Sequence, residues 1–299
     1  MKKQCIAACV AAVLIAGVPL AACGTEEDGT ANTVPVPGET DVVSPAPEIP
    51  DLPELPDDPQ PPETADPPTT PDPEPEPETP PVSEPIPLLA QYIYVRSNGL
   101  NVRAGAGTAY TSLGTVESDV LLKFVGKTDG WYETVYKNRT AYVSANEKYT
   151  SVTLLDKGEG DVENVIEEGL RLLGVPYVYG AVRLHDGNGN FLKGFTVKQF
   201  DCSSLMQYIF YQGAGKLLNM NTRTQVSQGK EVAKKDIKRG DLLFFTNASR
   251  KNNTGVERIG HVALYLGDNY ILHTASDYAK IEQISSQRWS YYITARRVL

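Results

Sequence analysis

Proline is distributed very unevenly along this chain of 299 residues. Of its 22 prolines, 20 lie between Pro35 and Pro87, and only Pro176 falls in the last 200 residues. Acidic side chains gather in the same stretch, since residues 24–90 contain 17 Asp and Glu and no Lys or Arg. Such a composition buries too little apolar surface to offset the entropy lost on ordering the chain. The sequence therefore excludes a single 299-residue globule and predicts a disordered, acidic, Pro-rich tether over residues 23–90.

The remainder of the chain has an ordinary globular composition. Residues 91–299 carry 26 basic and 20 acidic side chains, a net of +6, whereas the formal charge of the whole chain is −9. This length suits one domain of about 60 residues and one of about 140. A charge of +6 is modest, and we expect no nucleic-acid partner.

The N-terminus has the pattern of an export signal. Met1-Lys2-Lys3 is positively charged, and the apolar run from Cys5 to Leu20 is shorter than the ~20 residues that a spanning helix needs. We therefore predict a signal peptide over residues 1–22, with a retained membrane helix as the open alternative.

The end of this signal resembles the lipobox of bacterial lipoproteins. The motif is Leu20-Ala21-Ala22-Cys23, and the resemblance implies cleavage before Cys23 and lipidation of its sulfur. A protein anchored in this way lies outside the cytoplasm, held to the membrane at the cell envelope by several acyl chains. Because Cys5 and Cys9 would leave with the signal, Cys202 would be the one remaining thiol, and no disulfide framework is expected.

The sequence pattern of residues 91–150 predicts a small all-β barrel. Short apolar runs at 120–125, 131–136 and 141–143 alternate with turn residues at the spacing typical of such barrels. The motifs resemble the bacterial SH3-like domain: Leu100-Asn101-Val102-Arg103-Ala104-Gly105, Leu113-Gly114-Thr115, Gly130-Trp131-Tyr132 and Ala141-Tyr142-Val143-Ser144. That resemblance implies a module that binds wall peptides or positions a neighbouring peptidase, and we assign no ligand contact within it.

Two helices are predicted in the rest of the chain. The first begins near Gly160 with Asp161 as its cap, and ends by Gly174. The second carries apolar residues at helical spacing after Cys202 and stops at Gly213, with Asp201 as its natural N-cap. Cys202 would then lie in the first turn, where the helix dipole favours a thiolate and lowers a cysteine pKa from ~8.5 toward ~3.5–7.5.

Two of the three histidines of the chain lie in one predicted β-hairpin. A three-residue turn at 267–269 would pair Leu266 with Tyr270 and place His261 and His273 on the same face, two positions apart on the diagonal. A two-residue turn would place them on opposite faces. With the first arrangement, His261 can take a proton from Cys202 while His273 orients its ring.

Four segments together resemble the NlpC family of papain-like cell-wall cysteine peptidases, over residues 158–299. They are Pro176-Tyr177-Val178-Tyr179-Gly180, Phe200-Asp201-Cys202-Ser203, Gly240-Asp241-Leu242-Leu243-Phe244-Phe245 and the His261/His273 pair. The resemblance implies an α+β papain-like fold and a cysteine peptidase that hydrolyses peptidoglycan stem peptides, typically at the γ-D-glutamyl–diamino acid bond. The reaction would pass through a thioester and need neither a metal nor an organic cofactor.

The same resemblance implies roles for individual residues. Cys202 would be the nucleophile, His261 the base and His273 the third polar residue of the site. Tyr177 would help to stabilise the oxyanion. Asp201 and Ser203 match positions that contact the stem peptide in better-studied members, although a simple capping role for Asp201 remains open.

Three departures from the family pattern limit the inference. Ser204 and Gln225 stand where glycine and serine are common. Residues 181–199 form an insertion, for which we predict an extra hairpin with an Asp-Gly/Asn-Gly turn. A calcium loop is disfavoured, because Val197 occupies the position of the bidentate glutamate.

Two other classes of function stay open at this point. One is a wall-binding scaffold without catalysis, which the intact Cys202, His261 and His273 disfavour. The other is a cysteine-dependent acyltransferase or amidase on the same fold, because a thioester can also pass to an amine or form from another amide.

Overall fold

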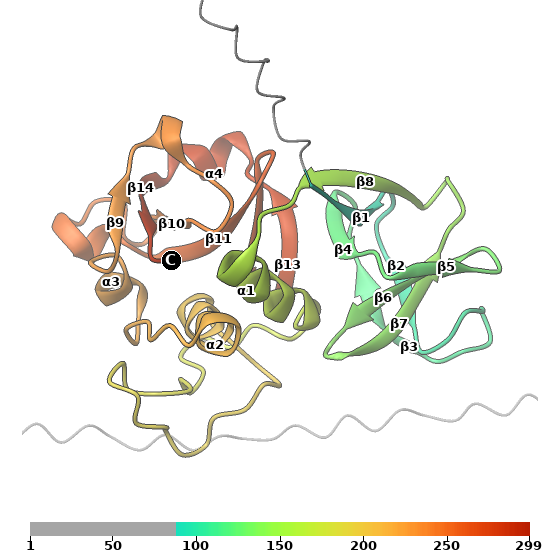
Figure 1. Ribbon diagram of the computed structural model, residues 1–299, viewed down its shortest axis with the longest axis horizontal. Coiled ribbons are helices and arrows are strands. Elements are labelled where there is room, and N and C mark those ends of the chain that lie inside the picture. Colours follow the sequence, from blue (N-terminus) through green and yellow to red (C-terminus); the bar gives the residue numbers. More distant parts are fainter. Residues whose placement is uncertain (1–87) are drawn as a thin grey trace, which may run out of the picture. The chain divides into compact units, whose positions relative to one another are not determined.

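The computed structural model of the protein describes residues 88–299 (Figure 1). The predicted export signal over 1–22, the lipidated Cys23 and nearly all of the predicted tether lie outside the described residues. Between Leu88 and Leu299 no helix is both long and apolar enough to cross a bilayer.

The first part of the described chain is an all-β barrel, as predicted. Its sheets are built from eight strands: β1 (Leu89–Val95), β2 (Leu100–Arg103), β3 (Ser112–Val116), β4 (Val120–Lys123), β5 (Gly126–Thr128), β6 (Trp131–Tyr136), β7 (Arg139–Ser144) and β8 (Thr150–Asp156). Five of them form a sheet in the order β3-β2-β7-β6-β5, and β8-β1-β4 belong to a second sheet. Alternate side chains of β6 and β7 point inward, and Ala141 and Val143 are fully buried.

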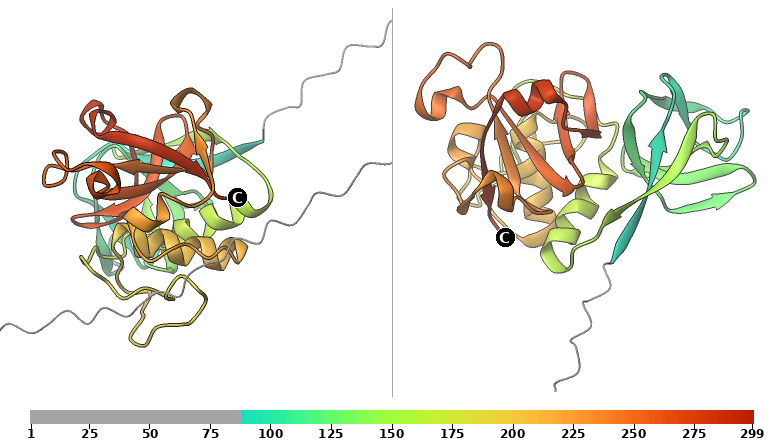
Figure 2. Two further views of the ribbon diagram at one scale, coloured as in Figure 1. Left: turned by 90° about the vertical axis from the view of Figure 1, so that its left-hand side faces the viewer. Right: turned by 90° about the horizontal axis from the view of Figure 1, so that it is seen from above.

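The second part combines helices with an antiparallel sheet, which confirms the predicted α+β class. Its elements are α1 (Gly160–Arg171), α2 (Cys202–Ala214), α3 (Thr222–Gln225), β9 (Lys230–Val232), η1 (Lys234–Asp236), β10 (Leu242–Phe245), η2 (Gly255–Arg258), β11 (His261–Gly267), β12 (Tyr270–Ala275), β13 (Tyr278–Gln283), α4 (Ser286–Ser290) and β14 (Tyr292–Arg297). The strand order is β13-β12-β11-β10-β14-β9. Figure 2 shows α1 and α2 together on one face of these strands.

The two predicted helices differ from expectation at their ends. Helix α1 begins at Gly160 with Glu159 as its N-cap residue, so Asp161 lies inside the first turn and is not the cap. Helix α2 runs through Gly213 to Ala214, and Gly215 caps its end with a left-handed φ of 62°. A Cβ atom on Gly213 would lie 2.5 Å from the backbone nitrogen of Val165. Gly213 therefore allows the close packing of α1 and α2 and does not stop the helix.

The strands of the barrel continue into the second part of the chain. Strand β4 pairs antiparallel with β13, with Leu121 opposite Ile281 and Val120 opposite Glu282. A nine-stranded sheet results, in the order β8-β1-β4-β13-β12-β11-β10-β14-β9. The backbone nitrogen of Lys137 also donates to the carbonyl oxygen of Leu173 at 2.7 Å. Strand β13, which lies next to β12, is thus hydrogen-bonded on both of its edges.

Gly174 is the position at which these contacts leave no room for a side chain. Its φ is +83°, and a Cβ atom there would lie 2.1 Å from the Tyr136 ring. We expect Gly174→Ala to lower the free energy of unfolding by about 3 kcal/mol or more, because left-handed strain adds to the displacement of a packed ring. Urea unfolding followed by circular dichroism measures the change.

Gly194 provides the matched control for this substitution. It has the same φ of +83°, but nothing lies within 4 Å of its Cβ position. Gly194→Ala should therefore cost only the backbone strain, on the order of 1 kcal/mol. Equal losses in the two variants would contradict the packing argument.

Candidate active site

Cys202 is the first residue of α2, and a capping box fixes it there. The Asp201 side chain accepts a hydrogen bond from the backbone nitrogen of Ser204 at 2.8 Å, and Ser204 Oγ accepts one from the backbone nitrogen of Asp201 at 2.8 Å. The predicted cap is confirmed. Ser204, which departs from the family pattern, has a clear structural role as the second half of the box.

The hairpin that carries the two histidines combines a two-residue turn with a bulge. Gly267 pairs with Tyr270, and both intervening residues, Asp268 and Asn269, have positive φ, as a type I′ turn requires. The predicted pairing of Leu266 with Tyr270 is therefore wrong. The ladder shifts between Tyr265 and Gly267, and beyond this bulge Leu264 lies opposite Leu272.

This bulge restores the register on which the site depends. Continuing the ladder from the Leu264–Leu272 pair places Ala263 opposite His273, so His261 and His273 share a face. Their rings meet with Nε2 of His261 2.9 Å from Nδ1 of His273. The predicted juxtaposition is thus present, although the turn that produces it differs from the predicted one.

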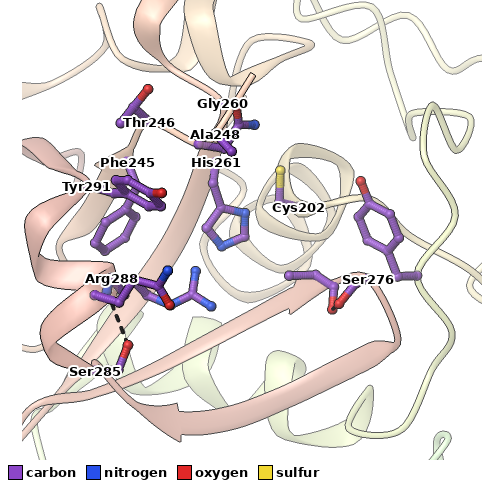
Figure 3. Close-up of a pocket in the computed structure, with 14 residues that line it drawn as sticks. Cys202, Phe245, Thr246, Ala248, Gly260, His261, Ser276, Ser285, Arg288 and Tyr291 are labelled. Carbon is purple, nitrogen blue, oxygen red and sulfur yellow. Dashed lines mark hydrogen bonds between the residues drawn. The ribbon is translucent and has the colours of Figure 1, made fainter. Parts of the chain in front are cut away.

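His261 and Cys202 line one cleft of about 420 Å³. Figure 3 shows the His261 ring beside Cys202 on the wall of this cleft. The cysteine is 9% exposed and His261 8%, whereas His273 is fully buried behind them. Tyr177 also lines the cleft. The structure therefore brings together Cys202, His261, His273 and Tyr177, all singled out in the sequence.

Glu282 extends this group and was not found from the sequence. Its Oε1 lies 3.1 Å from Nε2 of His273 and 2.9 Å from Nη2 of Arg288. The strand pairing could have located it. Strands β12 and β13 form another hairpin, in which His273 lies opposite Lys280. Glu282 is two residues beyond Lys280 on the same face of β13, so it is a diagonal neighbour of His273, as His261 is on the other side.

Burial dominates the protonation of the candidate nucleophile. It raises the pKa of the Cys202 thiol to about 12, with a further contribution from the Asp201 charge, while backbone contacts with Val262 and Ser203 act in the opposite direction. The expectation that the helix terminus would lower this pKa is therefore wrong, because desolvation of the thiolate outweighs the helix dipole.

The two imidazoles are neutral for the same reason. Burial lowers the pKa of His261 well below 6.5, and the adjacent His273 lowers it further. Burial also lowers the pKa of His273, against the opposing effect of Glu282. The resting site is thus a protonated thiol beside a neutral imidazole, and the proton has to move when the sulfur attacks.

Asp201 and Ser203 are engaged by Arg183. Nη2 of Arg183 lies 2.7 Å from Oδ2 of Asp201 and donates to Ser203 Oγ at 3.0 Å. All three residues line a second cleft of about 470 Å³, which also contains Cys202. The carboxylate is therefore already paired, and the charged group that faces the cleft beside it is a guanidinium. The sequence did not indicate a site role for Arg183, because this residue lies in the insertion.

The insertion and the Gln225 segment support this arrangement. His185 bridges to Phe191, and the side chain of Asp186 accepts hydrogen bonds from the backbone nitrogens of Asn188 and Asn190, which gives a short hairpin-like turn. Gln225 is fully buried and donates to the carbonyl oxygen of Ser203 at 3.0 Å. Within residues 88–299, no three His, Cys, Asp or Glu side chains are grouped so as to hold a metal ion.

Comparison with known proteins identifies both folded parts. Residues 174–298 match the NlpC/P60 family, and residues 98–159 match the bacterial SH3 domain. The chain is 32% identical over 143 residues to the gamma-DL-glutamyl hydrolase of Bacillus subtilis, covering 48% of this chain and 30% of that protein. It is 28% identical over 181 residues to the gamma-D-glutamyl-L-lysine dipeptidyl-peptidase of the same organism, covering 59% of this chain and 53% of the relative.

Among solved structures, an NlpC/P60 family protein from Bacillus cereus aligns with 21% identity. The alignment has a TM-score of 0.38 and covers 70% of this chain and 64% of that one. The chain thus spans between about a third and a half of the two curated relatives named above.

The pH dependence of alkylation tests whether the pKa of the Cys202 thiol is raised. Since the thiolate is the reactive form, alkylation of Cys202 by iodoacetamide should keep rising about tenfold per pH unit from pH 7 to 9. The denatured chain is the control, in which the rate should level off near pH ~8.5. Mass spectrometry of the Cys202 peptide measures both. A rate in the folded protein that is already constant below pH 7 would show an ion pair instead.

Proposed function

Because the chain carries an NlpC/P60 domain behind a bacterial SH3 domain, we propose that it is a cysteine peptidase that cleaves peptidoglycan stem peptides. The bond cleaved is that between γ-D-glutamate and the diamino acid. The observation that carries this proposal is the cleft in which Cys202, at a helix N-terminus, lies with an imidazole that is itself bonded to His273 at 2.9 Å.

The proposed reaction starts from a protonated Cys202 thiol beside a neutral His261 imidazole. His261 removes the proton of the Cys202 thiol as the sulfur attacks the scissile carbonyl, and a C–S bond forms. The C–N bond then breaks, and the amine leaves with the proton held by His261. Water, deprotonated by His261, attacks the thioester and releases the acid, and the sulfur recovers its proton. Tyr177 and the backbone N–H of Cys202 would stabilise the oxyanion.

The charge around the cleft supports an acidic substrate. Arg183, Arg223 and Arg250 line the cavity beside Cys202. Asp201 pairs with Arg183, while Glu257 pairs with Arg223 at 3.3 Å and Arg250 at 3.1 Å, so the guanidinium groups outnumber the carboxylates by one. A stem peptide with a free α-carboxylate on its D-glutamyl residue complements this surplus. The names of both Bacillus subtilis relatives also include a γ-glutamyl bond.

The other segments of the chain are consistent with an enzyme that acts outside the cytoplasm. The signal over 1–22, a lipid on Cys23 and the tether over 23–90 would hold the enzyme at the membrane and let it reach the wall. The barrel over 91–150 and the peptidase over 158–299 would act there in wall remodelling or turnover. The support for the anchor is the lipobox pattern in the sequence.

Digestion of purified muropeptides tests the proposed activity. The wild-type protein should release products cleaved after γ-D-glutamate, and Cys202→Ala and His261→Ala should lower kcat at least 10³-fold while remaining folded, because nucleophile and base act as one unit. Mass spectrometry identifies the products. No cleavage by the wild-type protein would leave the scaffold alternative, and a product of higher mass would indicate acyl transfer.

Arg183 allows a test of the substrate class. Four of its five N–H groups are used by the carbonyls of Met220 and Ala181 and by Asp201 and Ser203, which leaves one on Nη1. We expect wild-type kcat/KM to be about 10–100-fold higher for a stem peptide with a D-glutamyl α-carboxylate than for its α-carboxamide, as loss of a charged hydrogen bond predicts.

Arg183→Gln should reduce this preference, and the exposed Arg139→Gln is the control, which should leave it unchanged. The preference is measured as the ratio of kcat/KM values for the two peptides. The same ratio in Arg183→Gln as in the wild type would rule out Arg183 as the carboxylate contact.

A further inference from the structure

The direction of the hydrogen bond between the two histidines decides whether His261 can act as a base. Nε2 of His261 and Nδ1 of His273 are 2.9 Å apart, and between two neutral rings only one of these nitrogens carries the proton. If His273 donates, His261 must hold its own proton on Nδ1, the nitrogen left for the Cys202 side. It then cannot accept the thiol proton. If His261 donates from Nε2, its Nδ1 has a free lone pair.

The surroundings of His273 distinguish these two arrangements. Its other ring nitrogen, Nε2, is buried and makes no hydrogen bond of acceptable geometry within residues 88–299, but Oε1 of Glu282 lies 3.1 Å from it. In the described part of the chain this nitrogen has no other polar partner. A carboxylate can only accept, so it stabilises a proton on Nε2 and would repel a lone pair there.

Glu282 is held in place and kept ionised. Arg288 lies 2.9 Å away and Lys280 3.5 Å away, and both are cationic. Burial alone would raise the pKa of Glu282, but its contacts with His273, Arg288 and Lys280 outweigh this and lower the pKa to about 2. Its strand β13 pairs with β12 on one edge and with β4 on the other, where Val120 lies opposite Glu282. The carboxylate is therefore fixed against His273.

We propose that Glu282 is a positioning residue that sets the tautomers of both histidines. By accepting the proton on Nε2 of His273, it makes Nδ1 of His273 an acceptor for the Nε2–H of His261, which leaves Nδ1 of His261 free to receive the proton of Cys202. The assignment of tautomers stands on the geometry alone, whereas its effect on turnover rests on the proposed function.

The proton balance of the reaction is unchanged by this addition. The thiol proton moves to Nδ1 of His261 and later leaves with the amine, so Glu282 neither gains nor loses a proton. While His261 is an imidazolium, its Nε2–H remains bonded to His273, and the Glu282 charge stabilises the cation through that ring.

Nitrogen NMR of histidine-labelled full-length protein tests the tautomers without reference to activity. The chain has only three histidines, and His185 is a built-in reference because its Nδ1 accepts the Gly187 backbone N–H at 3.0 Å. At pH 7.5 the wild-type protein should show His261 and His273 both protonated on Nε2. A wild-type spectrum with His261 protonated on Nδ1 would overturn the proposal, whatever any variant does.

Glu282→Leu is the decisive variant, because it removes the acceptor beside Nε2 of His273, so that a proton kept on this buried nitrogen would have no partner and the reverse chain of bonds is favoured. We expect both rings to move to the Nδ1–H form and kcat to fall about 10²–10⁴-fold, with KM little changed. Glu282→Asp, which keeps an acceptor, should retain the wild-type tautomers and more of the activity. Glu231→Gln removes an exposed acid near Arg296 on the same sheet and should behave as the wild type.

The outcomes separate this proposal from the proposed function. A tautomer switch together with the loss of kcat supports the role of Glu282. Lost turnover with unchanged tautomers, or a switch without lost turnover, overturns it. If the wild-type protein shows the expected tautomers but cleaves no muropeptide, the proposed function fails while the role of Glu282 in the tautomers stands.

Discussion

A hydrogen bond between two buried, neutral imidazoles is the interaction on which the rest of the site depends. It requires two strands in one register, a cleft dry enough to keep both rings uncharged, and a partner that fixes the position of the shared proton. The hairpin of β11 and β12 provides the register, and the packing of α2 against these strands provides the burial. Glu282 on β13 is the partner we infer.

Burial also explains the character of the candidate nucleophile. A helix N-terminus stabilises a thiolate, but here the sulfur is almost completely enclosed and next to a carboxylate, and both effects raise its pKa. The proton therefore stays on sulfur at neutral pH, and a base that can accept it at the moment of attack becomes essential. The orientation of His261 thus matters more in this protein than in a site whose cysteine is already ionised.

The sequence was informative wherever a local pattern determined the structure. Alternating apolar residues located the barrel strands, and helical spacing after Cys202 located α2 and its Asp201 cap. It failed where the outcome depended on contacts between distant segments. Arg183 meets Asp201 only because an insertion folds back over α2, and Gly213 is a packing residue only because α1 lies against it. The pKa of Cys202 depends on burial, which no local pattern reports.

The bulge between Tyr265 and Gly267 has a consequence for how this hairpin can vary in length. Leu266 is the extra residue of this bulge, because Tyr265 lies opposite Ile271 while Gly267 lies opposite Tyr270. A chain without Leu266 could keep both pairs beyond a regular two-residue turn, and His261 would still share a face with His273. The site is lost instead when Leu266 is drawn into the ladder, since every residue of β11 before it would then shift by one position and His261 would face away from His273.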